Sequence, residues 1–208
     1  QAPYLYYLYQ SYGFLESQIA ILYVTGFATN VVCSVVSVHL VQRYERRVLC
    51  LAFVGMNSIS CLIKFSDSYT LLMAGRVMDG FAASLLTMPF HQWYVHEHVT
   101  TFDFPKEWIG STFRRVAVLS GFLSVAAGFV AEFSESTFRI TAFPFLIAIP
   151  VLIAGGFYMA RGWSENRLDP DLRPPFWSQW SRALRTIGQR PIVFLLSAVQ
   201  SLFESTIY

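Results

Sequence analysis

The segment from residue 69 to 95 is largely apolar, yet it contains Arg76, Asp79 and His91. Placing a charged side chain in hydrocarbon is costly, so an ionisable residue within a long apolar segment is a candidate for function. Arg76 and Asp79 are three residues apart and share a helix face, which Thr87 and His91 continue. This pattern predicts one wall of a hydrated substrate path in which Arg76 attracts an anion. The alternative is a buried Arg76–Asp79 pair that only locks helices together.

A second charge, Glu204, lies in the apolar run over residues 192–208, between the polar residues Gln200 and Ser205. A carboxylate in such a position is able to take up a proton or to pair with a basic side chain across a cavity. We therefore predict a coupling or gating role for Glu204. The alternative is a position near the membrane interface.

The segments that must position these residues are long and apolar. Of 208 residues, 54% are hydrophobic and 13% are charged, and the charged share is about half that of a soluble domain. A membrane-spanning helix uses about 20 mostly apolar residues, and a spanning strand is much shorter and alternates. The sequence therefore predicts an all-α membrane protein and excludes a soluble domain, a disordered chain and a disulfide scaffold. Complete spans are expected over residues 17–41, 48–65, 69–95, 108–133 and 138–160.

Partial apolar segments lie on both sides of these spans. Residues 1–10 are rich in Tyr and are expected to be the end of a helix, and residues 191–208 are expected to begin another. We accordingly expect the chain to be a piece of a longer protein.

The basic residues predict the orientation in the membrane. They gather in the connection after residue 41, near residue 106 and in the stretch from 161 to 190, whereas Lys64 and Arg139 are placed at helix edges on the other side. Loops rich in Lys and Arg normally face the cytosol, so we expect the Arg-rich side to be cytosolic. Within the linker over residues 163–190, apolar residues recur every three or four positions between Phe176 and Ile187. This periodicity predicts an amphipathic helix on the inner leaflet.

The sequence does not indicate a metal site, nucleic-acid binding or catalysis. His96 and His98 are two residues apart and point to different sides of a helix, so no metal site is expected. The net charge of +2 is too small to suggest nucleic acid. We find no phosphate loop, nucleophile elbow or paired catalytic carboxylates, and therefore expect neither an enzyme nor a cofactor. The expected partners are membrane lipids and a small solute.

Several motifs resemble the major facilitator superfamily and, within it, the molybdate-anion transporter branch. Residues 72–83 (LMAGRVMDGFAA) resemble the superfamily's fourth-helix motif of a Leu, an Arg and a Gly followed by small residues. The pieces that resemble the branch keep its order along the whole chain: 1–6 (QAPYLY), Glu16 with 18–23 (QIAILY), 93–98 (WYVHEH), 104–109 (FPKEWI) with Thr112 and Phe113, and 200–205 (QSLFES).

The resemblance implies twelve helices in two six-helix halves that alternate access to a site near the membrane midplane. Residues 1–162 would then form the N-terminal bundle, from the end of helix 1 to helix 6. Residues 163–190 would form the cytosolic linker, and 191–208 the start of helix 7. The missing C-terminal half would be the bundle's main partner.

Two departures from the pattern concern gating and the cavity. The superfamily's loop between helices 2 and 3 usually carries an Asp and a Gly before its basic pair. Here Gln42 and Glu45 stand at those places, followed by Arg46 and Arg47, and these four are the predicted gating-loop residues. The branch usually has Phe-Glu before the Trp of helix 4, whereas this chain has His91 and Gln92 before Trp93.

The resulting hypothesis is a secondary transporter in the plasma membrane for a small inorganic anion, molybdate. Arg76 would attract the anion, and Tyr4, Tyr6, His91, Gln92 and Trp93 would add hydrogen-bond donors. Two alternatives stay open. One is a membrane scaffold or receptor that keeps the fold without transport, and the other is a transporter of a different organic anion or a sugar.

Overall fold

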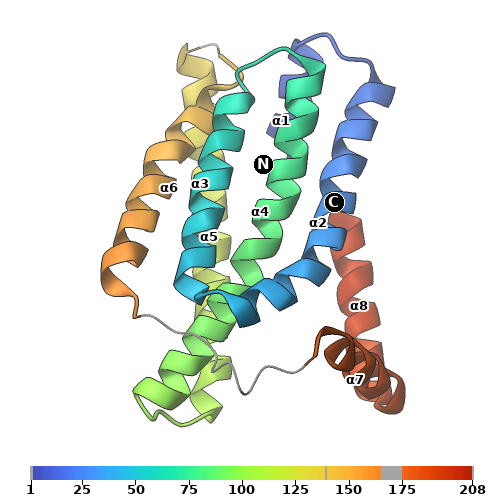
Figure 1. Cartoon of the computed structure of the whole chain (residues 1–208). Helices are drawn as coiled ribbons and strands as arrows, with labels where there is room; N and C mark the ends of the chain where they lie inside the picture. The colour runs from blue at the N-terminus through green and yellow to red at the C-terminus, as the bar shows by residue number, and fades with distance from the viewer. Residues whose placement is uncertain (1, 139, 165–174, 208) are drawn as a thin grey trace. The chain divides into compact units, whose positions relative to one another are not determined.

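The computed structural model describes residues 2–138, 140–164 and 175–207, and every regular element among them is helical. The prediction of an all-α chain is therefore confirmed. The chain divides into two units, residues 3–167 and residues 168–208. Figure 1 shows the helices of both units. The larger unit contains α1 (Ala2–Ser11), α2 (Glu16–Arg43), α3 (Arg46–Ile63), α4 (Tyr69–His96), the π-helical turn η1 (Glu97–Thr101), α5 (Glu107–Phe138) and α6 (Phe143–Gly162).

Five helical segments among the described residues are long and apolar enough to cross a membrane: α2, α3, α4 with η1, α5 and α6. Their bounds differ from the predicted ones mainly around α5. The prediction ended one span at residue 133 and began the next at 138, whereas α5 continues to Phe138 and α6 begins at Phe143. Polar residues near the end of α5 do not interrupt its backbone hydrogen bonds. Pro144 follows at the start of α6, where a missing N–H costs nothing.

The helix ends explain how the chain reverses between neighbouring spans. Gly13 has φ of +81°, a conformation that glycine adopts without steric cost, in the turn between α1 and α2. At the start of α2, the Leu15 N–H donates to the Gln18 side chain at 3.0 Å and so satisfies one exposed amide. The connections are short, which makes successive helices antiparallel.

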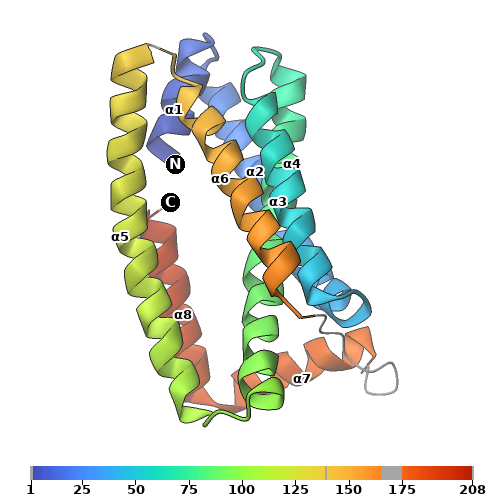
Figure 2. The same cartoon turned by 90° about the vertical axis from the view of Figure 1, so that its left-hand side faces the viewer.

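The helix α4 has two main neighbours in this unit. It packs against both α2 and α3, and α3 also packs against α6, as the two views in Figures 1 and 2 show. The helices α2 and α4 approach each other closely at Gly80. A Cβ atom on Gly80 would lie 2.5 Å from the Gly26 carbonyl oxygen and 2.9 Å from the Asn30 nitrogen. Glycine at this crossing therefore lets the two backbones touch.

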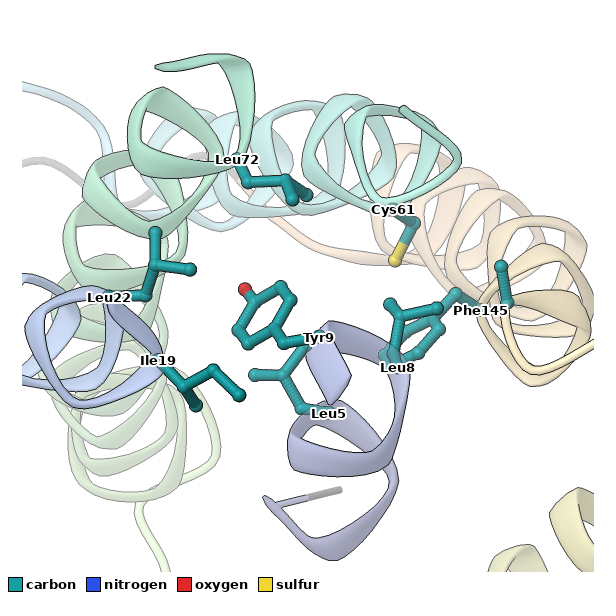
Figure 3. Packing of buried hydrophobic residues seen from close by; sticks show 9 residues of the cluster. Leu5, Leu8, Tyr9, Ile19, Leu22, Cys61, Leu72 and Phe145 are labelled. Carbon is teal, nitrogen blue, oxygen red and sulfur yellow. The ribbon is translucent and has the colours of Figure 1, made fainter. Parts of the chain in front are cut away.

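A cluster of buried apolar residues closes one end of the bundle around Tyr9 of α1, which has no exposed surface. Figure 3 shows the side chains that converge on it from four other helices: Ile19 and Leu22 of α2, Cys61 of α3, Leu72 of α4 and Phe145 of α6. Cys50 and Cys61 are buried free thiols, and Cys33 is half-buried. This cluster includes Cys61 near the end of α3 and Leu72 near the start of α4, close in sequence to Lys64, Arg76 and Asp79.

The smaller unit contains α7 (Phe176–Gln189) and α8 (Pro191–Ile207). Along α7, Trp177 is 77% exposed and Leu184 is 64% exposed, although both are large and apolar. The same helix carries Arg182 and Arg185. This combination of an apolar face and a basic face is typical of a helix that lies in a membrane interface.

Candidate functional site

Three charged side chains from α3 and α4 meet inside the larger unit. Asp79 Oδ2 lies 3.0 Å from Lys64 Nζ and 3.4 Å from Arg76 Nη1. Asp79 Oδ1 accepts hydrogen bonds from the Ser60 hydroxyl and, at 3.2 Å, from Lys64 Nζ. Both carboxylate oxygens are therefore bonded, and Lys64 also donates to Ser60 Oγ at 3.2 Å.

This group of Ser60, Lys64, Arg76 and Asp79, called the ion cluster below, is buried and carries a net positive charge. The side chains of Lys64, Arg76 and Asp79 are 8%, 12% and 17% exposed. Two cations face one carboxylate, so the pairing leaves positive charge within an apolar bundle. Buried charge persists only where hydrogen bonds and counter-charges compensate its lost hydration. A surplus of positive charge is what a site that takes an anion requires.

The surroundings hold the two cations in place. Arg76 Nε donates to the Leu22 carbonyl at 3.3 Å, and the guanidinium group lies 5.2 Å from the centre of the Tyr23 ring. Lys64 Nζ lies 5.2 Å from the centre of the Phe145 ring. These aromatic faces favour a nearby cation. The cations are thus positioned by α2 and α6 as well as by Asp79.

Lys64 and Ser60 are the residues of this site that the sequence analysis missed. Lys64 was placed at a helix edge because it follows the apolar run of α3 directly. In the structure it is the C-terminal cap of α3 and is buried. Its long apolar stem lets the ammonium group reach a partner away from its own backbone position. The available signal was the spacing of Ser60 and Lys64, which puts both on one helix face.

The structure separates Arg76 and Asp79 from the residues predicted farther along α4. His91 lies fifteen residues beyond Arg76, which corresponds to about 22 Å along a helix. There His91 stacks on Phe113, with 4.6 Å between ring centres. Trp93 stacks on Trp163 at 3.8 Å and is nearly parallel to it. Gln92 is half-buried in the same turn, and the side chains of Thr87 and Glu204 lie outside the described residues.

A second group of hydrogen-bonded side chains lies at the C-terminal end of α4 and in η1. The Trp93 Nε1–H group donates to the Ser164 carbonyl at 3.3 Å, and the Ser164 hydroxyl donates to the Glu97 carboxylate. Both ring nitrogens of His98 are within hydrogen-bonding distance of a partner, Tyr94 Oη at 3.2 Å and the Pro105 carbonyl at 2.9 Å. Among the described residues, no group of three or more His, Cys, Asp or Glu is arranged to hold a metal.

The remaining predicted residues lie at other places in the larger unit. The Tyr4 hydroxyl donates to Glu132 on α5 at 2.6 Å, and Tyr6 is 39% exposed. Tyr9 and Tyr23, rather than these two, form an aromatic pair beside Arg76, with ring centres 6.4 Å apart.

The gating-loop residues lie where α2 ends and α3 begins. Gln42 lies in the last turn of α2, Glu45 is the N-terminal cap of α3, and Arg46 is buried in the first turn of α3. Arg47 donates to the Ala160 carbonyl near the end of α6. The loop is thus tied to α6 through a basic side chain.

Comparison with known proteins identifies the family to which the chain belongs. Residues 1–208 match a family described as sugar transporters with 12 transmembrane segments. The molybdate-anion transporters of Xenopus laevis and Danio rerio are 42% and 41% identical to the chain over its whole length. These alignments cover 46% and 48% of the two relatives, so the chain spans about half the length of the curated relatives that it matches. No solved structure matches the chain.

The family match agrees with the fold, since five apolar helices of spanning length are present among the described residues. The resemblance to the molybdate-anion transporter branch, first indicated by short motifs, is confirmed over the full chain. The chain is thus part of an integral membrane protein and belongs to the major facilitator superfamily of transporters.

Proposed function

We propose that the full-length protein containing this chain is a secondary transporter of a small oxyanion, with molybdate as its substrate. The observation that carries the proposal is the net positive charge of the ion cluster, buried between α3 and α4. The relatives at 42% and 41% identity are named molybdate-anion transporters, which supports molybdate as the solute. Transport would proceed by alternating access between two halves.

The donors of the cluster suit a tetrahedral dianion. Arg76 offers several N–H groups in a fixed plane, Lys64 offers a compact ammonium group, and Ser60 offers a hydroxyl. Charge-assisted hydrogen bonds of this kind are about twice as strong as neutral ones. Several donors around the anion would replace the water that it loses on binding, which a single cation could not do.

The other predicted residues would line the path on either side of the cluster. Tyr4, Tyr6, His91, Gln92 and Trp93 are proposed as donors along it, and Glu204 as a coupling or gating carboxylate. Gln42, Glu45, Arg46 and Arg47 are proposed as the gating loop. We place the Arg-rich loops in the cytosol and α7 on the inner leaflet, because basic loops are retained on the cytosolic side. We propose the plasma membrane as the location of the protein.

The test is uptake of radiolabelled molybdate by cells that express the full-length protein. Arg76→Ala should reduce uptake at least about tenfold at equal surface expression, because it removes a charge-assisted donor worth more than about 1.4 kcal/mol. Arg115→Ala, at an exposed arginine of α5, is the matched control and should transport normally.

The alternatives give different results in the same assay. Unchanged uptake by Arg76→Ala would remove Arg76 from the anion site. Inhibition of labelled uptake by sugars, but not by oxyanions, would identify a sugar transporter. Normal surface expression without any molybdate uptake would instead favour a scaffold or receptor.

A further inference from the structure

The helix α7 carries apolar and basic residues on different sides. Trp177, Trp180 and Leu184 follow one another at spacings of three and four residues, so they share one helix face. Trp177 and Leu184 are exposed on that face. Arg182 and Arg185 are also exposed, and their positions along the helix place them away from it. Large apolar side chains that gather at a surface mark a contact with a partner or with a membrane.

The basic side of this helix has no acidic residue to balance it. Arg182 and Arg185 of α7 are exposed, as is Arg190, its C-terminal cap. No Asp or Glu occurs between residues 176 and 190. The ion pairs among the described residues belong to the ion cluster and involve none of these arginines. The segment therefore presents three positive charges that lack a counter-charge in the part of the chain that the structure describes.

The hydroxyl groups on the polar side are already used within the segment. Each donates to a carbonyl three or four residues earlier: Ser178 to Pro175 at 2.7 Å, Ser181 to Ser178 at 3.0 Å, and Thr186 to Arg182 at 2.8 Å. The guanidinium groups remain for a partner, and they present planar sets of N–H donors that bind phosphate and carboxylate in a bidentate manner. The polar side thus has the chemistry of an anion-binding surface.

The chain turns sharply between α7 and α8. Arg190 has an extended backbone, with φ of −115° and ψ of 96°, and Pro191, which lacks a backbone N–H, begins α8. Figure 2 shows that α7 runs across the end of α8 rather than in line with it. Both helices belong to the smaller unit, and α8 is apolar from Pro191 to Leu202. A bilayer that α8 enters would therefore meet α7 lengthwise, at its surface.

We infer that α7 together with Arg190 is a binding surface for anionic lipid headgroups. Trp177 and Leu184 enter the boundary of the acyl chains, and the arginines pair with the phosphate and carboxylate groups of lipids such as phosphatidylserine. Their long side chains let the guanidinium groups reach the headgroup layer from the polar side of the helix. Each arginine near such a surface strengthens binding about fivefold.

A bilayer suits this surface better than an acidic protein does. It offers an apolar layer and a layer of negative charge at one place, and α7 presents an apolar side and a basic side along one helix. The inference rests on the proposed placement of α7 at the membrane surface, but it does not depend on the solute that the full-length protein carries. Lipid binding and transport are therefore measured separately.

The test uses the full-length protein in nanodiscs, where both faces carry the same lipid and the orientation of the protein does not affect the result. Hydrogen–deuterium exchange of the α7 amides is compared between discs of phosphatidylcholine and discs that also contain about 30% phosphatidylserine. We expect slower exchange with phosphatidylserine, and loss of this difference at about 1 M salt, which screens surface charge. Equal exchange in the two discs overturns the inference, and so does a difference that high salt leaves unchanged.

Two double variants separate the arginines of α7 from positive charge elsewhere. Arg182→Gln with Arg185→Gln should reduce the extra protection by phosphatidylserine at least about tenfold, because two charge contacts are lost. Arg114→Gln with Arg115→Gln removes the same charge from exposed positions of α5 and should leave the protection of α7 unchanged. Full protection in the first pair overturns the inference. If that pair does not express, the salt dependence of the unaltered protein decides. Absence of molybdate uptake would overturn the proposed function and leave the lipid result standing.

Discussion

The two ends of α4 hold polar side chains in different ways. Near its start, Arg76 and Asp79 join Lys64 in a buried ion cluster, where each charge depends on the others. Near its end, Trp93 stacks face to face on Trp163 and forms a single hydrogen bond to a carbonyl group. Removing one member of a buried ion pair leaves an uncompensated charge, whereas removing one stacked ring loses mainly apolar contact. The first end should therefore tolerate change less than the second.

The two ends of α4 also differ in how closely the backbone packs against neighbouring helices. Towards the first end, Gly80 lies so close to α2 that a Cβ atom on it would be 2.5 Å from the backbone oxygen of Gly26, and a Cβ atom on Gly26 would meet the Arg76 guanidinium group. At the other end, the contact with the residues that follow α6 is made by side chains: Trp93 stacks on Trp163, and the Ser164 hydroxyl donates to Glu97. Side chains change partners at smaller cost than interlocked backbones. A conformational change during transport would thus be expected at the end of α4 rather than at its start.

The largest effect is expected at the glycine crossing. In Gly80→Ala the new Cβ atom would lie 2.5 Å from a backbone oxygen, so the two helices must move apart. We expect a loss of about 3 kcal/mol or more in stability, measured by thermal unfolding of purified full-length protein. Gly55→Ala on α3, where a Cβ atom meets nothing within 4 Å, is the control and should unfold like the parent. Equal unfolding temperatures for both variants would contradict the proposed close packing.

An intermediate effect is expected for Lys64→Met, which keeps the apolar stem and removes the charge. The cluster would lose its net positive charge, and the affinity for an anion should fall about tenfold, because a charge-assisted hydrogen bond contributes about 1.5–3 kcal/mol. Concentration dependence of molybdate uptake measures this change. Lys106→Met, at an exposed lysine in the connection before α5, should leave uptake unchanged. Equal affinity in the two variants would remove Lys64 from the site.

The smallest effect is expected at the stacked tryptophans. A double-mutant cycle with Trp93→Ala and Trp163→Ala should give a coupling energy of about 1 kcal/mol, the usual value for an aromatic pair. Chemical unfolding of the single and double variants measures it. The same unfolding assay gives the loss of unfolding free energy caused by Lys64→Met. If the coupling energy of the tryptophans exceeds this loss, the end of α4 tolerates change less than its start, contrary to our expectation.

The sequence determined the helical fold and two members of the site. Apolar segments of about 20 residues predict spanning helices because hydrocarbon satisfies no backbone hydrogen bond. The sequence also shows that Arg76 and Asp79 lie within one of these apolar segments, where a charged side chain costs free energy. Both inferences depend on properties of a single segment, and such properties are read directly from the order of residues.

Only the tertiary structure decided which side chains meet. It brought Lys64 and Ser60 of α3 to Asp79, and Tyr23 of α2 to Arg76. It also brought Phe113 to His91 and Trp163 to Trp93. The contacts of Asp79 and Arg76 depend on how α2, α3 and α4 cross, and the crossing of α2 and α4 is fixed by the space that Gly26 and Gly80 leave. A helical pattern gives the face on which a residue lies, but the neighbour on that face is set by packing between helices.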